Sequence, residues 1–360
     1  MEKPDDDSNL PTEIICFEIL PRIPRASLVH FQCVSNSWNA LLNTNPGFWR
    51  IHRNFHPRNT GHLLLYAHVS GSGATGKDYL LLVKASQDGN TPSHVTDLMR
   101  LPCSLFKTKY ANGLVLGDSA WNSDPTYIFN LCTRESVIVP NPTFQYDGLY
   151  FGCSPSTNEY KVVATHDIEG VVGFKIFTLG QASWRNIMVD WHHLSFVRPP
   201  PSDFCRLATS HEAILALDIG DERFTFIPVP SQCKLNNKYK KTIEVDGCLG
   251  IVCGDYGIDV NNVIVLWILM DYRHQVWVAE TIKVNRYGPY RLRFRSSYLP
   301  QCTTHTGELV FEVTKDNYLQ LYDRKSKSFR QSKIIFPEIL RDLGLRLCYS
   351  AVSFDDCATS

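Results

Sequence analysis

The chain has 360 residues, and its 36 Lys and Arg balance its 36 Asp and Glu, so its formal net charge at pH 7 is zero. That balance argues against general nucleic-acid binders and membrane-surface binders, which carry an excess of basic residues. Hydrophobic residues make up 44% and aromatic residues 12% of the chain, with 21 Gly and 20 Pro, which is typical of a globular protein of many short strands and turns.

The N-terminus and the cysteines favour a reducing compartment. Residues 1–9 are acidic and polar, so we expect a disordered N-terminus and no secretory signal. The twelve Cys are irregularly spaced and form no CxxC pair. In a chain of 360 residues this pattern does not indicate a disulfide framework. The longest apolar run, Val263–Met270, is far shorter than the ~18 residues of a membrane-spanning helix. We expect a cytoplasmic or nuclear protein with no membrane partner.

Residues 10–56 predict a small all-α module of three short helices. Pro11 and Glu13 are helix-start signals, and Pro21 and Pro24 end the first helix. Apolar residues at helical spacing predict a second helix over 25–35 and a third over 35–43. Of the 47 residues in this segment 22 are apolar, more than helices of this size bury among themselves. Something outside the module must cover the remaining apolar surface.

The same segment resembles the F-box, the adaptor-binding module of SCF ubiquitin ligases. The resemblance is carried by Leu10-Pro11, Glu13-Ile14, Glu18-Ile19-Leu20, Pro24, Ser27-Leu28, Val34-Ser35, Trp38 and Phe48. Ile23 departs from the usual Leu, and Asn36 from the more common Lys or Arg. The alternative is a helical cap that seals one face of the β domain.

The F-box resemblance implies a Skp-type adaptor as partner and, through it, a cullin and a RING subunit. The adaptor-binding residues that follow from it are Leu10, Pro11, Ile14, Ile19, Leu20, Ile23, Pro24, Leu28, Val34 and Trp38. Burial of one large apolar side chain contributes about 1.5–3 kcal/mol.

Residues 57–355 predict a β domain, because short apolar runs alternate with Gly, Asp, Asn and Pro. The candidate strands are 62–66, 79–83, 160–164, 171–177, 213–219, 263–269, 308–313 and 318–322. Several of them are continuously apolar, as expected for strands buried on both faces between stacked sheets.

A repeat of hairpins runs through this domain. An apolar or aromatic residue is followed by a polar one, and an aromatic residue recurs seven positions after the first. The copies are Phe177-Thr178…Trp184, Leu217-Asp218…Phe224, Met270-Asp271…Trp277 and Tyr322-Asp323…Phe329, with a degenerate copy at Phe129-Asn130. Periods of about 40–50 residues are typical of propeller blades, and about 300 residues divided by ~50 predicts six blades. A β-sandwich with recurring hairpins is the alternative.

This region also resembles the F-box-associated domain of plant F-box proteins. The pieces that match in order include Asn112-Gly113-Leu114, Phe129-Asn130, Val139-Pro140, Tyr150-Phe151-Gly152, Asn158-Glu159-Tyr160-Lys161, Ser183-Trp184-Arg185, Gly247-Cys248-Leu249 and Leu269-Met270. Cys153 and Ser154 depart from the usual Gly or Asp that follow Gly152.

Three motifs suggest chemistry, and each has a simpler explanation. Residues 71–78 match GxGxxG and nearly match a phosphate-binding loop, but such a loop precedes a helix, and here a strand is expected to follow. The basic run Lys238–Lys241 is interpreted as a solvated turn. Cys248 and Cys253 have no second pair of ligands, so we interpret them as two small buried residues rather than a metal site. We therefore predict no catalytic residue, no metal and no cofactor.

Together these observations predict a non-catalytic substrate receptor of an SCF-type ubiquitin ligase in the pathway of proteasomal degradation. The F-box would bind the adaptor, and the β domain would bind a target protein. A propeller hydrolase or lyase with a helical extension is the alternative from another class, and a scaffold outside ubiquitin ligation is a third. No pattern in the sequence indicates the target protein, a small-molecule co-ligand, the pathway or the oligomeric state.

Overall fold

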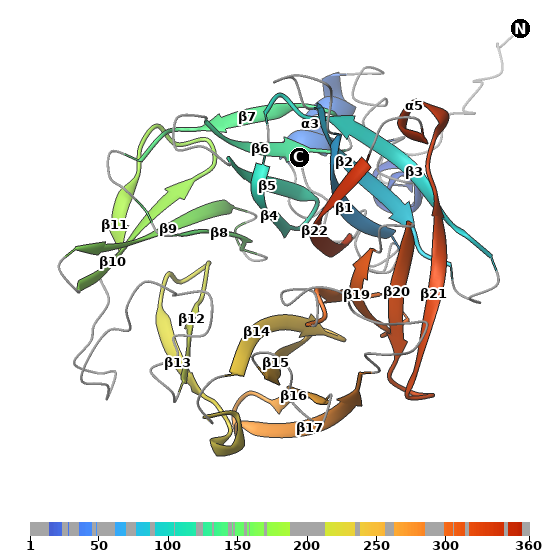
Figure 1. Cartoon of the computed structure of the whole chain (residues 1–360). Helices are drawn as coiled ribbons and strands as arrows, with labels where there is room; N and C mark the ends of the chain where they lie inside the picture. The colour runs from blue at the N-terminus through green and yellow to red at the C-terminus, as the bar shows by residue number, and fades with distance from the viewer. Residues whose placement is uncertain are drawn as a thin grey trace, which may run out of the picture.

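The computed structural model is mainly β, as predicted (Figure 1). The structure describes residues 14–23, 28, 36–44, 48, 62–69, 77–86, 91–103, 105–119, 125–131, 133–142, 146, 148–154, 157, 159–168, 171–187, 213–234, 238–255, 263–284, 299–304, 306–313, 317–341 and 345–354. In that part of the chain no helix is both long and apolar enough to cross a membrane.

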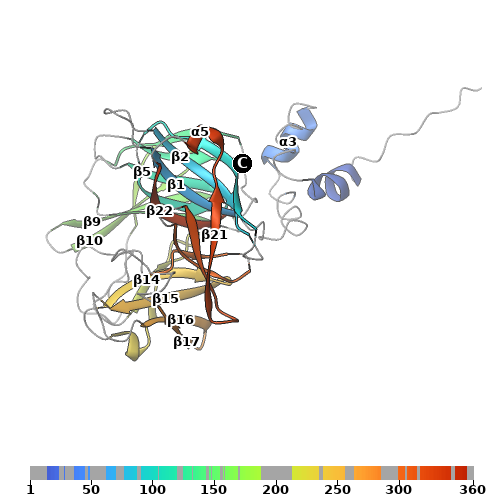
Figure 2. The same cartoon turned by 45° about the vertical axis from the view of Figure 1, so that its right-hand side comes forward.

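The described helices of the N-terminal module are η1 (Ile15–Ile19), η2 (Leu20–Arg22) and α3 (Asn36–Thr44). The first is a π-helical turn rather than the predicted α-helix, because the Leu20 N–H donates to the Ile15 carbonyl. Pro21 is the second residue of the 3-10 turn that follows, where its missing N–H breaks no hydrogen bond. The predicted third helix coincides with α3, whereas the second lies outside the described residues except for Leu28. Figure 2 shows this module at one side of the β domain.

Twenty-two strands are described in the β domain. In chain order, the first eleven are β1 (His62–Val69), β2 (Lys77–Lys84), β3 (Ser93–Arg100), β4 (Leu105–Ala111), β5 (Leu114–Ser119), β6 (Thr126–Asn130), β7 (Ser136–Val139), β8 (Gly148–Cys153), β9 (Tyr160–Ile168), β10 (Val171–Thr178) and β11 (Arg185–Ile187). The second eleven are β12 (Ala213–Leu217), β13 (Phe224–Pro228), β14 (Lys238–Val245), β15 (Cys248–Asp255), β16 (Val263–Asp271), β17 (Val276–Lys283), β18 (Cys302–Thr303), β19 (Leu309–Val313), β20 (Tyr318–Asp323), β21 (Ser328–Ile335) and β22 (Leu345–Phe354). Two short helices, η3 (Ser231–Lys234) and α5 (Glu338–Arg341), lie between them.

The strands form antiparallel sheets of consecutive segments, arranged in a ring (Figure 1). Three sheets have four strands each, β4–β7, β8–β11 and β14–β17, and β12 pairs with β13. The largest sheet has the order β18-β19-β20-β21-β3-β2-β1-β22. It joins two four-stranded groups through a short parallel contact, in which Ile334 and Ile335 of β21 pair with Ser93 and His94 of β3.

The two ends of the β domain meet in one sheet. β22 is the last strand of the chain, and it pairs with β1 from Leu345 opposite Val69 to Phe354 opposite His62. β22 also lies beside β18 and β4, while β4 lies beside β8 and β14 beside β18. Pairing between the first and last strands closes the ring and satisfies backbone groups that an open edge would leave unpaired.

The predicted hairpin repeat is confirmed by the strand register. Leu217 pairs with Phe224 and Tyr322 with Phe329, and Leu269 pairs with Trp277 across a bulge. In each turn the Asp carboxylate accepts backbone hydrogen bonds; Asp218, for example, accepts from the N–H groups of Gly220 and Asp221, both at 2.8 Å. The repeated polar residue therefore caps the turn, as its position in the sequence indicated.

A left-handed residue recurs at a fixed place in these turns. It stands four positions after the capping Asp or Asn, with φ between 54° and 62° at Arg134, Glu222, Gln275 and Lys327. The copy that begins at Thr178 instead has Gly180 at φ 89°. The left-handed residue thus reverses the chain at the same offset in the four copies with Asp or Asn, and two positions after the polar residue in the copy with Thr178.

The glycine-rich segment before Asp78 connects two strands, as predicted. β1 ends at Val69, β2 begins at Lys77, and these two residues pair with each other. A strand rather than a helix follows the motif, so the helix N-terminus that a phosphate-binding loop requires is not there.

The interpretation of Lys238–Lys241 as a solvated turn is wrong. These residues form the first half of β14 and pair with Asp255 to Val252 of β15. The basic run did not indicate a strand, because a run of Lys is unfavourable in a sheet unless the long side chains reach water or polar partners.

Apolar clusters lie between successive groups of strands. The cluster between β14–β17 and β18–β21 contains twelve buried residues in the described part: Ile243, Val245, Val252, Ile264, Leu266, Ile268, Ile282, Val284, Leu299, Leu309, Phe311 and Tyr322. Such clusters explain why strands such as β16 are apolar on both faces.

Candidate functional site

The N-terminal module has a small core of its own. Leu20, Leu28 and Phe48 are almost fully buried, and Ile23 and Trp38 pack against them together with Ile15 and Leu41. Trp38 and Leu41 are one turn apart on α3, so the same face of that helix supplies both. Helical residues widely separated in sequence therefore hold η1, η2 and α3 together.

A second group of apolar side chains in this module is exposed. Ile14, Phe17 and Ile19 retain 40%, 42% and 38% of their accessible surface, although all three are large and hydrophobic. They stand within six residues of one another on and beside η1. Exposed apolar side chains gathered in this way mark a surface that another protein can cover.

The predicted adaptor-binding residues divide into three sets. Ile14 and Ile19 lie on the exposed surface. Leu20 and Leu28 are buried, and Ile23 and Trp38 are half-buried, in the core of the module itself. The remaining four, Leu10, Pro11, Pro24 and Val34, lie outside the described residues. As the structure stands, Leu20 and Leu28 support the surface from beneath rather than form it.

Phe17 belongs to the exposed set but was missing from the predicted anchors. Its signal in the sequence was the helical spacing Ile14–Phe17, three positions apart. A charged rim lies beside it, since Arg22 Nη2 is 3.2 Å from Glu18 Oε2 and Arg22 Nε donates to the Glu18 carbonyl at 2.8 Å. An apolar patch with a polar rim is the ordinary composition of a protein-binding surface.

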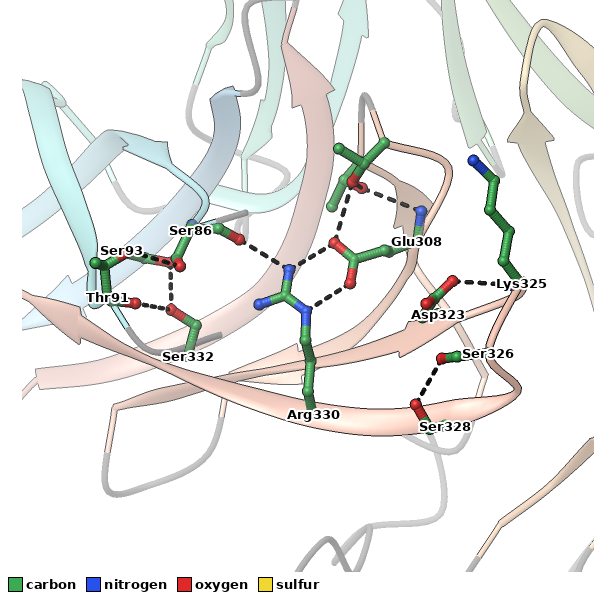
Figure 3. Close-up of polar contacts among 12 residues, drawn as sticks. Ser86, Thr91, Ser93, Glu308, Asp323, Lys325, Ser326, Ser328, Arg330 and Ser332 are labelled. Atoms are coloured by element: carbon green, nitrogen blue, oxygen red, sulfur yellow. Dashed lines mark hydrogen bonds and ion pairs between the residues drawn. The ribbon is translucent and has the colours of Figure 1, made fainter. Parts of the chain in front are cut away.

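A largely buried ion pair of the β domain, Arg330 with Glu308, lies beside contacts between segments far apart in sequence (Figure 3). Arg330 on β21 donates to both Glu308 carboxylate oxygens, at 2.5 and 2.6 Å, and to the Ser86 carbonyl at 2.8 Å. Next to it, the Ser93 and Ser332 hydroxyls share a buried hydrogen bond of 2.8 Å. The cluster lies where β21 meets the end of β2 and the start of β3, so its hydrogen bonds to Ser86 and Ser93 join the two groups of strands.

Other ion pairs of the β domain connect neighbouring sheets. Lys161 of β9 donates to Glu222 at 2.8 Å, and Arg185 of β11 also pairs with that carboxylate. Arg185 lowers the pKa of Glu222, and burial opposes this effect only in part. Arg324 bridges Glu280 and Asp246 of the neighbouring sheet, at 2.5 and 2.6 Å. Because the partners of these charged groups lie on neighbouring sheets, we infer that these ion pairs stabilise the ring rather than form a binding site.

Two tryptophans connect adjacent sheets at equivalent places in the repeat. Trp184 Nε1 donates to the Pro140 carbonyl at 2.7 Å, and Trp277 Nε1 donates to the Pro228 carbonyl at 3.1 Å. Each proline stands ten positions after the capping residue of the preceding hairpin, Asn130 or Asp218. The aromatic residue of the repeat therefore also fixes one sheet against the next.

Lys241 differs from Lys161, Arg185, Arg324 and Arg330 because, among the described residues, its hydrogen-bond partner is a neutral amide rather than a carboxylate. Its Nζ donates to Gln301 Oε1 at 2.5 Å. Burial lowers the pKa of its ammonium group from the ordinary 10.5 to about 8, the nearby Cys302 raises it and Lys109 lowers it. Within the described ranges, no group of three or more His, Cys, Asp or Glu could hold a metal ion.

Comparison with known proteins gives a consistent family. The family described as F-box associated beta propeller domain matches residues 73–339. Two relatives from Arabidopsis thaliana are F-box protein At2g16450, 24% identical over 84% of this chain and 82% of its own, and F-box protein At2g15640, 25% identical over 84% and 82%. Among solved structures, TolB from Acinetobacter baumannii has a TM-score of 0.43 and 11% identity over 78% of this chain and 69% of its own, too low to carry an argument.

Proposed function

The chain belongs to the family of plant F-box proteins with an F-box-associated β-propeller domain, and on that premise we propose that it is the substrate-recognition subunit of an SCF ubiquitin ligase. In this role the N-terminal module binds a Skp-type adaptor, which connects it to the cullin and RING subunits. The β domain binds the protein to be modified. The chain itself performs no covalent chemistry.

The exposed patch of Ile14, Phe17 and Ile19 is the observation that carries this proposal. The module closes its own core with Leu20, Leu28 and Phe48, yet leaves these three side chains in water. When a partner covers them, their apolar surface is removed from water, which contributes about 25 cal/mol per Å² to the free energy of binding. Stable protein interfaces bury about 1,200–2,000 Å² in total, so the patch would form the centre of a larger contact.

We assign six blades to the β domain. The support is that six apolar clusters connect the groups of strands in a cycle. The groups that they connect in order are β1–β3, β4–β7, β8–β11, β12–β13, β14–β17 and β18–β21. Each group packs on the one before and the one after it, and β22 completes the first group by pairing with β1. A closed ring of this kind presents its loops on two rigid faces, which suits recognition of a protein surface.

The contribution of such a receptor to ubiquitin transfer is proximity. Holding a target protein on the β domain while the adaptor is held on the helical module raises the effective concentration of target lysines near the ligase. This mechanism requires two separate protein-binding surfaces on one chain, and the module lies at one side of the β domain (Figure 2).

Co-purification of the full chain with a Skp-type adaptor tests the proposal. The double variant Ile14→Asp and Phe17→Asp places two charges in the patch without touching the buried core, so we expect at least a tenfold loss of affinity, since each 1.4 kcal/mol is a factor of ten. The matched control is Val137→Asp with Ile138→Asp on β7, where two aliphatic side chains are similarly exposed, at 52% and 55%.

The control should bind like the wild type. Equal binding by the patch variant, or no adaptor binding by the wild type, would overturn the proposal. Reconstitution with cullin, RING subunit and a captured target then separates a ligase receptor from a scaffold, because only the receptor supports ubiquitin transfer to that target.

A further inference from the structure

The described part of the chain contains one close contact between two thiols. Cys233 lies in η3, directly after the β12–β13 sheet, and Cys253 lies in β15 of the next sheet. Their sulfur atoms are 2.7 Å apart, and the side chains are 1% and 4% exposed. The bonded distance in a disulfide is about 2.04 Å, so the sulfurs need to move together by only about 0.7 Å.

The surroundings of the pair make it specific. Both cysteines belong to one apolar cluster, with Ile214, Ile227, Val229, Ile251 and Leu269, that fills the interface between the two sheets. Cys248 is on the same strand as Cys253 but five positions away, and it packs against the cluster on the opposite side of the sheet. Side chains an odd number of positions apart point to opposite faces of a strand, so Cys233 rather than Cys248 is the partner of Cys253.

We propose that Cys233 and Cys253 are a modification site, a thiol pair that a peroxide converts to a disulfide joining the β12–β13 sheet to the β14–β17 sheet. The proposal is independent of the adaptor and of ubiquitin transfer. It concerns the smallest sheet in the described part of the ring, where a covalent bond would have the largest effect on how firmly that sheet is held.

The reaction balances with hydrogen peroxide as the oxidant. One thiol loses its proton and the thiolate attacks a peroxide oxygen; the O–O bond breaks, and the expelled hydroxide takes up that proton and leaves as water, which gives a sulfenic acid. The second thiol loses its proton and its thiolate attacks that sulfur; the S–O bond breaks, the S–S bond forms, and the expelled hydroxide takes up the proton and leaves as a second water. Two thiols are oxidised to one disulfide while one peroxide is reduced to two waters.

Access for a small oxidant is provided by the position of Cys233. Ser231 and Gln232 of the same four-residue turn are exposed, whereas Cys233 points inward. Opening of this short turn, which is held by a Cys233 N–H bond to the Pro230 carbonyl at 2.8 Å, exposes the sulfur to peroxide. A bulkier disulfide reagent would react more slowly at this buried site than at an exposed thiol.

Mass spectrometry of the full chain tests the proposal directly. The protein is treated with hydrogen peroxide, free thiols are alkylated under denaturing conditions, and the chain is digested with trypsin. The sequence places Cys233 in peptide 224–234 and Cys253 in peptide 242–273. We expect these peptides joined, with a combined mass about 2 Da below that of the two reduced peptides, and separated again by a thiol reductant.

Variants assign the bond to this pair. Because peptide 242–273 also contains Cys248, the matched control Cys248→Ser must still give the joined peptides, and Cys233→Ser must give none. Recovery of both Cys233 and Cys253 in alkylated form, at a peroxide concentration that oxidises the more exposed Cys103, would overturn the proposal. So would a bond between Cys248 and either of them. In the wild type, fragmentation of the joined peptides shows whether Cys248 or Cys253 carries the alkyl group, so this experiment decides the question even where a serine variant fails to fold.

Discussion

The helical module and the β domain bury apolar side chains on very different scales. Among the described residues the module has three nearly fully buried side chains, Leu20, Leu28 and Phe48, and leaves three others exposed beside them. A single interface of the β domain, between β14–β17 and β18–β21, buries twelve. The module is therefore built to be completed by a partner, whereas the β domain completes itself by closing its ring.

The two regions also treat charge differently. The described ion pair of the module, Arg22 with Glu18, lies on the surface, where such a pair contributes about 0–1 kcal/mol. In the β domain, ion pairs such as Lys161 with Glu222 connect different groups of strands and are only 4% and 18% exposed. Charges at sheet boundaries are useful there because they specify which strands come together, not only how tightly.

The largest effect is expected from truncating the β-domain core. Phe311 is fully buried, so Phe311→Ala should lower the free energy of unfolding of this domain by about 3–5 kcal/mol through lost burial and the cavity left behind. Urea denaturation followed by tryptophan fluorescence measures the change. Val276→Ala, at a site 47% exposed, is the control and should change it by less than about 1 kcal/mol. Similar losses at both sites would contradict the assignment of the core.

The same substitution in the module should have a local result. Phe48 is also fully buried, and Phe48→Ala should cost the module a similar 3–5 kcal/mol, which exceeds what a core of this size supplies. We expect loss of adaptor binding while the unfolding midpoint of the β domain stays unchanged. A shift of that midpoint as large as that of Phe311→Ala would show that the two regions fold as one unit.

Removing one charge of a largely buried ion pair in the β domain should rank next. Arg330→Met leaves the Glu308 carboxylate largely buried without its cation, which should destabilise the β domain by about 2–3 kcal/mol after allowance for partial exposure. The double variant with Glu308→Gln removes the unpaired charge and should recover part of the loss. Denaturation of the wild type, both single variants and the double variant gives the coupling energy; a value near zero would contradict a structural role for the pair.

The smallest expected effect is the contribution of Lys241 to the free energy of unfolding, and it should depend on pH. The folded-state pKa of Lys241 is about 8, below its ordinary 10.5, because burial disfavours the charged form. Below pH 8 the Lys241 side chain is protonated in both the folded and the unfolded chain, so the folded state bears the full cost of burying the charged ammonium group. Between pH 8 and 10.5 only the unfolded chain holds this proton, so stability from this group rises with pH.

Lys241→Met removes that dependence. The variant should be more stable than the wild type at pH 7 by on the order of 1–3 kcal/mol, and the difference should shrink as the pH rises from 8 to 10.5. Thermal or urea denaturation at several pH values measures it. A constant difference across this range would contradict the lowered pKa.

The sequence determined the features that local chemistry controls. A capping Asp, a left-handed turn residue and an aromatic residue at fixed offsets act within about ten residues, so the hairpin at Leu217, Asp218 and Phe224 could be predicted from spacing alone. The strand that follows the glycine-rich segment was also predictable, because its apolar run is too short and too regular for a helix. The resemblance of residues 10–56 to the F-box rested on the same kind of local pattern.

The tertiary structure decided everything that depends on distant partners. Whether Leu20 faces a partner or its own core depends on Leu28 and Phe48, which no periodicity connects to it. Lys241 is part of a strand because β15 pairs with its segment. Cys253 contacts Cys233 rather than Cys248 because two side chains an odd number of positions apart on a strand point to opposite faces of the sheet. Ring closure by β22 likewise required the two ends of the domain to meet, since backbone hydrogen bonds between strands carry no signature in either strand alone.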